Sequence, residues 1–95
     1  MRDWLKGLEE TVRKEIGADI LKVQWRWPVS KPLVDGLGGG LYEVRTTHDK
    51  KEYRVLFIVE DGVMVLLHGF NKRTQKTPTS ELEVARNRRR NVSSS

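Results

Sequence analysis

Apolar residues recur every three or four positions over the first quarter of the chain, which is the period of an α-helix. Charged side chains fill the positions between them, so we expect an amphipathic helical region from about Asp3 to Gln24. Because glycine is unfavourable inside a helix, Gly7 predicts a break between a short helix and a longer one. Pro28 should end the longer helix by Trp27. The apolar positions are Leu5, Leu8, Val12, Ile16, Ile20 and Val23.

From Leu41 onward the hydrophobic period changes to two, as in β-strands. Residues 41–47, 53–59 and 63–70 show this pattern, and Asp61-Gly62 supplies a tight turn between the last two. We therefore predict an antiparallel meander whose middle strand, apolar on both faces, runs through the sheet centre. The Gly38-Gly39-Gly40 run lacks the spacing and the lysine of a nucleotide-binding loop and is interpreted as a flexible turn into the first strand.

A last helix is predicted from Pro78 to Arg90, because Thr77 is a good cap and proline suits the first helical position. Leu82 and Ala85 give it only a thin apolar stripe, and arginines crowd its end, so it is either loosely held or completed by a partner. The predicted fold class is α+β, with an N-terminal helical pair, a three-stranded or four-stranded antiparallel sheet and a C-terminal basic helix. We expect a single domain over residues 1–92 and a disordered tail at 93–95, with disorder beginning near Asn91.

The net positive charge is confined to the last thirty residues. Residues 66–95 hold seven Lys or Arg and two acids, whereas the first 65 residues balance eleven basic against eleven acidic side chains, so the formal charge of +5 arises from the end of the chain. Confined charge is typical of a surface that meets a polyanion, most commonly nucleic acid. The alternative is a solvated basic helix and tail.

Composition excludes several classes of site. The chain of 95 residues contains no cysteine, so disulfides, thiolate metal sites and cysteine nucleophiles are impossible. The longest apolar runs, Val55–Val59 and Val63–Leu67, are far shorter than the roughly 20 residues that cross a bilayer. Two histidines without an i, i+4 partner do not supply a catalytic metal site. We expect a cytoplasmic protein with no membrane contact, metal or cofactor.

Arg54 and the tryptophans Trp25 and Trp27 each have both a functional and a structural interpretation. Arg54 lies between apolar neighbours, so its charge must be met by a ligand phosphate, by backbone carbonyl oxygens or by a carboxylate such as Glu43 or Glu52 across the hairpin. Trp25 and Trp27 either stack on bases or close one end of the core, and we favour the core.

The segment from His68 to Lys76 joins the last strand to the last helix and contains three cations, two amides and no acid. It is a candidate phosphate-binding edge. Lys72 and Lys76 would disfavour each other's charge, so a neutral amine could accept a proton, although they equally could only screen charge. His68 is either an acid–base group or a hydrogen-bonded side chain at a strand end.

Gly40–Arg45, Tyr53–Phe57 and Val65–Pro78 resemble the RelE/HigB superfamily of bacterial toxins, in its phage-derived, HigB-like branch. The resemblance extends from about Trp4 to Arg90, and its sharpest part is the string His-Gly-Phe-Asn-Lys-Arg-Thr-Gln-Lys-Thr-Pro. It implies a RelE/ParE-like fold and a metal-independent endoribonuclease that cleaves messenger RNA, usually at the ribosome. It also implies an antitoxin partner, commonly a helix-turn-helix protein.

In the implied mechanism the RNA 2′-hydroxyl attacks its own phosphate, and cations stabilise the charge that develops. The implied catalytic residues are Arg54, Lys72, Lys76 and His68, and the implied RNA-binding residues are Arg45, Arg73, Gln75 and Arg86. Two other functions stay open, namely a non-catalytic module that binds RNA or protein, and a ParE-like inhibitor of gyrase.

Overall fold

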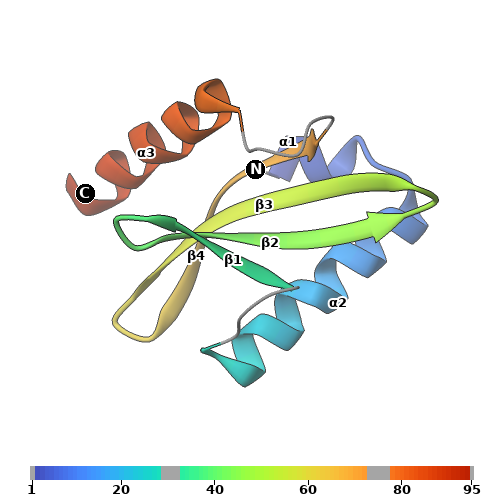
Figure 1. The fold of residues 1–95 in the computed structure, drawn as a ribbon, viewed down its shortest axis with the longest axis horizontal. Helices are drawn as coiled ribbons and strands as arrows, with labels where there is room; N and C mark the ends of the chain where they lie inside the picture. Colours follow the sequence, from blue (N-terminus) through green and yellow to red (C-terminus); the bar gives the residue numbers. More distant parts are fainter. Residues whose placement is uncertain (1, 29–32, 73–77, 95) are drawn as a thin grey trace.

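The computed structural model describes residues 2–28, 33–72 and 78–94, with the side chains of residues 2, 72 and 92–94 excepted. The fold is α+β, as predicted, with helices before and after an antiparallel sheet (Figure 1). The elements in chain order are α1 (Arg2–Lys6), α2 (Glu10–Arg26), β1 (Val34–Gly38), β2 (Leu41–His48), β3 (Lys51–Glu60), β4 (Val63–Lys72) and α3 (Thr79–Ser94).

The first helical region divides near Gly7, as predicted. The Gly7 amide donates to the carbonyl oxygens of Asp3 and Trp4, both at 3.2 Å, and closes the last turn of α1. The second helix follows after Glu9, which caps α2 in an extended conformation. The second helix ends at Arg26, because Trp27 precedes Pro28 and takes an extended conformation with ψ of 136°.

The sheet has four strands in the order β1-β2-β3-β4, and each neighbouring pair is antiparallel. The middle strand of the predicted meander, β3, lies inside the sheet. The predicted turn at Gly38-Gly39-Gly40 is confirmed, because all three glycines have positive φ and connect β1 to β2. The additional strand β1 lies directly before this turn, and its Asp35 and Gly36 interrupt the alternation by which the other strands were predicted.

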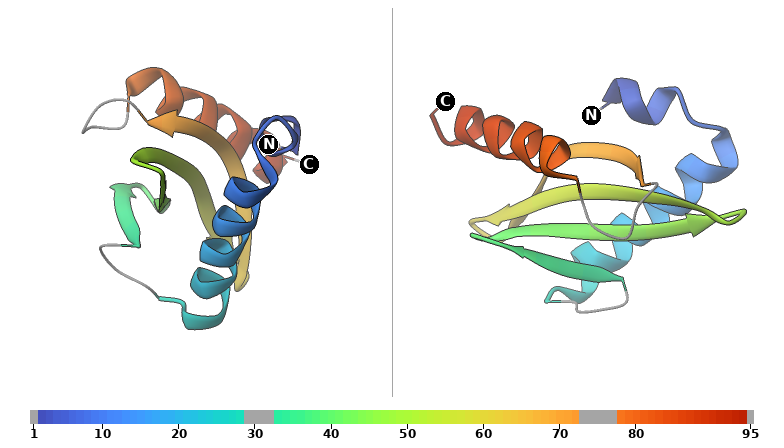
Figure 2. Two further views of the ribbon diagram at one scale, coloured as in Figure 1. Left: turned by 90° about the vertical axis from the view of Figure 1, so that its right-hand side faces the viewer. Right: turned by 45° about the horizontal axis from the view of Figure 1, so that its top comes forward.

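Helices cover both faces of the sheet, with α2 on one side and α3 on the other (Figure 2). The middle strand therefore contributes to two cores, with alternate residues facing opposite ways. The first core, under α2, contains Val12, Ile16, Val23, Val34, Val44, Tyr53, Val55 and Phe57. The second core, under α3, contains Leu41, Leu56, Ile58, Leu67, Phe70 and Ala85.

The two tryptophans near the end of α2 lie in different surroundings. Trp27 packs edge-to-face on Tyr42 and Phe57, with ring centroids 4.8 and 5.6 Å away, and closes the first core as favoured above. Trp25 is 83% exposed, so the core interpretation is wrong for this residue. Its side chain points into solvent. Because Trp25 and Trp27 are only two residues apart, the sequence did not show that one is buried and the other exposed.

The last helix starts at Thr79, one residue after the expected start at Pro78, and ends later than expected. The Pro78 carbonyl oxygen accepts from the amides of Glu81 and Leu82, while Thr77 lies outside the described residues. The helix continues to Ser94 instead of stopping at Arg90, so it extends into the segment for which we predicted disorder. No glycine or proline follows Arg90 to break it. Among the described helices, none has the length and apolar character to cross a membrane.

Candidate functional site

Two arginines meet on the face of the sheet that α3 covers. Arg45 of β2 and Arg54 of β3 are direct register partners, and opposite residues of an antiparallel pair share a face. Arg54 alternates with Tyr53 and Val55 of the first core, so it points to the same side as Leu56 of the second core. Strand pairing thus fixes the two guanidiniums as neighbours.

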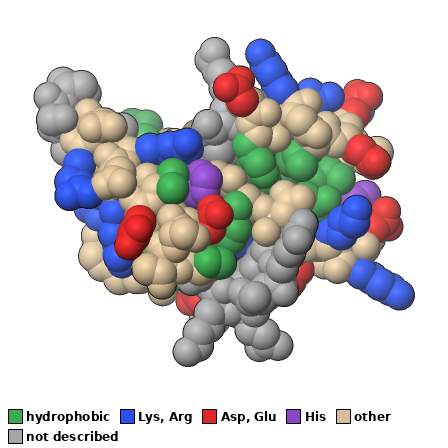
Figure 3. All heavy atoms as spheres, turned by 90° about the horizontal axis from the view of Figure 1, so that it is seen from above, with side chains coloured by type: hydrophobic (Ala, Val, Ile, Leu, Met, Phe, Trp, Pro, Cys, Tyr) green, Lys and Arg blue, Asp and Glu red, His purple; other side chains and the backbone are tan. Residues whose placement is uncertain are grey.

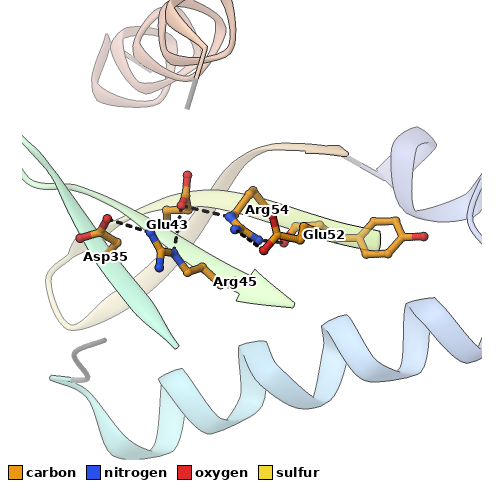
Figure 4. A network of polar contacts seen from close by, with 6 residues as sticks. Asp35, Glu43, Arg45, Glu52 and Arg54 are labelled. Carbon is orange, nitrogen blue, oxygen red and sulfur yellow. Dashed lines mark hydrogen bonds and ion pairs between the residues drawn. The ribbon is translucent and has the colours of Figure 1, made fainter. Parts of the chain in front are cut away.

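Three carboxylates hold these guanidiniums (Figure 4). Glu43 Oε1 lies between them, 3.2 Å from Arg54 Nε and 3.4 Å from Arg45 Nε. Asp35 Oδ2 is 3.1 Å from Arg45 Nη2, and Glu52 Oε1 is 3.2 Å from Arg54 Nη2. We call Asp35, Glu43, Arg45, Glu52 and Arg54 the arginine network. The ion pairs predicted for Arg54 with Glu43 or Glu52 are both present.

Burial divides the arginine network into a fixed part and an open part. The side chains of Arg54 and Glu43 are 4% and 1% exposed, whereas that of Glu52 is 47% exposed. Arg54 Nη1 also donates to its neighbour's carbonyl oxygen, on Tyr53, at 3.1 Å. Arg54 Nε does not point at Glu43 and is the one buried side-chain polar atom of the described residues that lacks a hydrogen bond. The Arg54–Glu43 contact is therefore an ion pair without an aligned hydrogen bond.

Three residues of the arginine network, Arg45, Glu52 and Arg54, line a surface hollow. Its lining residues are Asp19, Leu33, Arg45, Thr47, Glu52 and Arg54. A phosphate that enters this hollow would compete with Glu52 for Arg54, because both are oxygen acceptors for the same guanidinium edge. Of the two carboxylates that contact Arg54, the half-exposed Glu52 is more accessible to solvent and ligands than the buried Glu43.

The lysine-rich segment after β4 begins beside the arginine network. The Cα atom of Lys72 is the register partner of Glu52, two residues from Arg54 along β3. The side chain of Lys72 lies outside the described part of the structure, as do residues Arg73, Gln75 and Lys76. The backbone thus brings the start of this segment to Arg45 and Arg54.

His68 connects β4 to α3. Its Nε2 contacts the Glu81 carboxylate, and its Nδ1 lies 3.3 Å from Arg88 Nη1. A guanidinium only donates, so Nδ1 is placed to accept from Arg88, while Nε2 faces Glu81. The ring also stacks on Phe70 with centroids 5.8 Å apart. Because both ring nitrogens are engaged, this geometry favours the structural interpretation of His68 over the acid–base one.

Arg86 lies apart from the arginine network. It lines a second hollow, between the end of α3 and the β1–β2 turn. The other lining residues are Leu37, Gly38, Gly39, Leu41, Arg89 and Arg90. The basic residues implied as one site therefore occupy two surfaces in the described structure.

Several contacts of this region were missed by sequence reasoning. Asp35 was not considered because β1 was not identified as a strand. Arg88 donates to the Leu67 carbonyl oxygen at 2.8 Å. From the sequence, it was identified only as one of the arginines at the end of the last helix. The spacing of Glu81, Ala85 and Arg88 at helical intervals was the available signal, since it places all three on one side of α3, of which only Ala85 is buried.

Among the described residues, no group of three or more His, Asp or Glu side chains is placed to hold a metal ion. A family model described as phage-derived protein Gp49-like matches residues 3–90. No curated protein matches the chain.

Proposed function

The chain belongs to the phage-derived Gp49-like family, a toxin-like family related to RelE and HigB toxins, and from this we propose that it is the toxin of a type II toxin–antitoxin system. We propose further that it is an endoribonuclease that cleaves messenger RNA, on translating ribosomes, and thereby inhibits translation. The observation that carries this proposal is the pairing of Arg45 and Arg54 in one surface hollow of a member of this family.

The chemistry requires positive charge next to a phosphodiester. The 2′-hydroxyl of the RNA attacks the adjacent phosphorus, the bond to the 5′-oxygen breaks, and a cyclic phosphate and a 5′-hydroxyl remain. Negative charge grows on the phosphate oxygens in the transition state, and a guanidinium binds two such oxygens in a fixed geometry. In this proposal Arg54 is the phosphate clamp, and Arg45 and Arg73 contact the RNA beside it.

The arginine network prepares Arg54 for this role. Glu43 is buried between both guanidiniums and keeps them at a fixed separation, so little reorganisation is needed when phosphate binds. Glu52, which is half-exposed, is the acceptor that the phosphate replaces on Arg54. Exchange of one anionic acceptor for another leaves the buried guanidinium paired throughout.

We assign proton transfer to the end of β4 and the segment that follows it. The attacking 2′-hydroxyl must lose a proton and the leaving 5′-oxygen must gain one. Both nitrogens of His68 are already engaged with Glu81 and Arg88. We therefore assign proton transfer to Lys72 and Lys76, with Gln75 as an RNA contact.

The test is to incubate the purified protein with translating ribosomes and to map the 5′ ends of the messenger RNA. Cuts in phase with codons are expected from the wild type and should be lost in Lys72→Ala. Arg54→Lys keeps the charge but not the two-pronged geometry, and it should reduce cleavage strongly. Arg13→Ala, on the exposed surface of α2, is the matched control and should cleave as the wild type does.

Arg54→Ala is a poor variant for this experiment. It would leave Glu43 buried without one of its partners, and such a change destabilises proteins by about 3–5 kcal/mol. Loss of cleavage would then report unfolding, so the thermal unfolding of every variant has to be recorded.

The outcomes separate the proposed enzyme from other functions. RNA that is retained without cuts, by a folded protein, would contradict catalysis and support a non-catalytic binding module. DNA damage in cells with intact transcripts would instead support a ParE-like gyrase inhibitor. Rescue of growth by a helix-turn-helix protein encoded in the adjacent reading frame would support the proposed antitoxin partner.

A further inference from the structure

Three arginines of α3, Arg86, Arg89 and Arg90, carry positive charge away from the arginine network. In the arginine network, three carboxylates face two guanidiniums. None of Arg86, Arg89 and Arg90 forms an ion pair with a carboxylate among the residues that the structure describes. Arg89 donates to the Gly39 carbonyl oxygen and Arg90 to Asn87 Oδ1. Figure 3 shows Lys and Arg side chains at the end of the molecule where α3 lies and at the opposite end as well.

These three arginines surround the second hollow together with the β1–β2 turn. The apolar part of its lining comes from Leu37 and Leu41, of which Leu41 is buried. Arg86 and Arg90 are exposed, and Arg89 is half-buried against the turn. The hollow thus combines an apolar floor with a rim of guanidiniums that solvent can reach.

The glycine turn lets a ligand approach the backbone on the other side of this hollow. Gly38, Gly39 and Gly40 have φ of 93°, 62° and 81°, and a Cβ added at Gly38 or Gly39 would meet only open space. A Cβ at Gly40 would come 3.3 Å from Arg89 Nη2, so the turn and the arginine are in close contact. Peptide groups without side chains are therefore exposed beside the guanidiniums.

We propose that this hollow binds the phosphate backbone of a nucleic acid, as a docking surface separate from the arginine network. Three guanidiniums without an ion-pair partner among the described residues suit several phosphates of one strand, and the apolar floor suits its sugars or bases. The surface supplies affinity and orientation, while the arginine network acts on the bond to be cleaved. The choice of RNA over DNA rests on the proposed function.

The first test measures binding without cleavage. A fluorescein-labelled 2′-O-methyl oligouridine lacks the attacking hydroxyl, so its affinity is independent of catalysis. Arg86→Ala/Arg90→Ala should weaken binding roughly 25-fold at about 0.1 M salt and reduce the slope of log affinity against log salt by about 1.4. Arg13→Ala/Arg26→Ala removes the same charge from exposed positions of α2 and is the matched control.

The second test places a single charge in the hollow. Gly39→Asp and Gly39→Asn have nearly the same shape, and both residue types tolerate the left-handed backbone of this turn. Gly39→Asp should bind the oligouridine at least fivefold more weakly than Gly39→Asn, with similar thermal unfolding. An oligodeoxyuridine measured in parallel tells whether the 2′-position contributes.

Equal losses in the α3 and α2 double variants would overturn the docking surface, since binding would then follow net charge alone. Unchanged affinity in the α3 variant, or equal affinities of Gly39→Asp and Gly39→Asn, would also overturn it. Normal oligouridine binding by a protein that cleaves no message would remove the proposed function and leave the docking surface intact.

Discussion

At the scale of single residues, the environment of Arg54 decides how the candidate site works. A guanidinium with a 4% exposed side chain is stable only when its charge is compensated, and here Glu43 and Glu52 provide this compensation. The two interpretations drawn from the sequence, phosphate fork and ion pair, are therefore compatible. The ion pairs describe the free protein, and the fork is the proposed state with RNA.

Glu52→Gln should increase the affinity of the protein for RNA. The change removes the half-exposed competitor of phosphate on Arg54, and an ion pair of this exposure is worth about 1 kcal/mol or less. We expect about a two- to fivefold tighter complex with the 2′-O-methyl oligouridine, measured by fluorescence anisotropy.

Glu9→Gln is the control for Glu52→Gln, because it removes one negative charge from an exposed position outside the arginine network. If both variants tightened binding equally, Glu52 would not compete with phosphate.

The sequence predicted the ion-pair partners of Arg54 but not the Asp35 partner of Arg45. Arg54 was identified because its strand neighbours are apolar, and both of its predicted carboxylate partners are present. The pairing of Arg45 with Asp35 required β1, whose Asp35 and Gly36 hide the strand pattern. The surroundings of a long side chain depend on register and helix placement, which periodicity alone does not determine.

At the scale of elements, the helices and strands predicted best were those with a strong hydrophobic periodicity or with a glycine or proline at their ends. The break near Gly7, the end of α2 before Pro28 and the three longer strands are confirmed. The end of α3 was less predictable, because Asn91–Ser94 contains no breaker and its helical state depends on the preceding turns.

Gly69→Ala should loosen the contact between α1 and β4. A methyl group at this position would lie 2.2 Å from Trp4 Cε3, so the indole ring would have to move. We expect the free energy of unfolding to fall by about 1–3 kcal/mol, measured by chemical denaturation.

Gly36→Ala in β1 is the matched control, since its added methyl group would meet only Tyr42 Cε1, at 4.0 Å. A Gly69→Ala protein as stable as Gly36→Ala would show that Trp4 does not pack firmly on β4.

The connection between α2 and the β2–β3 turn should depend on pH. A hydrogen bond with Glu15 raises the pKa of His48 above 6.5, and the charges of Glu15, Asp49 and Glu9 act in the same direction. Because the pKa is higher in the folded state, protonation stabilises the fold. This contribution is fully present below about pH 6.5 and is lost as pH rises through the folded-state pKa.

Unfolding of the wild type and of Glu15→Gln, measured by denaturant titration from about pH 5 to about pH 9, tests this connection. The wild type should be the more stable of the two at low pH, and the difference should shrink as His48 loses its proton. A difference that stayed constant over this range would contradict the role of His48.

At the scale of the whole molecule, one sheet separates two cores, and each core depends on a helix from a different end of the chain. The second core has α3 as its cover, through Leu82 and Ala85. The thin apolar stripe of this helix is therefore sufficient for packing, and Ala85 is fully buried.

A chain that ends after Pro78 should not fold cooperatively, because it would expose the second core on one face of the sheet. We expect loss of the sharp thermal transition in circular dichroism, together with aggregation. A chain that ends after Asn91 keeps Leu82, Ala85 and the arginines and should unfold like the full protein. A cooperative transition in the shorter chain would show that α3 does not stabilise the sheet.

The division of labour along α3 has a consequence for how such a protein can diversify. Leu82 and Ala85 are constrained by the core beneath them, whereas Arg86 and Arg90 project into solvent and can be exchanged one at a time without disturbing the fold. Descendants of one ancestor can therefore change how strongly they hold a polyanion through single codon changes. The affinity for a polyanion and the packing of the second core therefore depend on the same helix, yet the two properties can evolve at different rates.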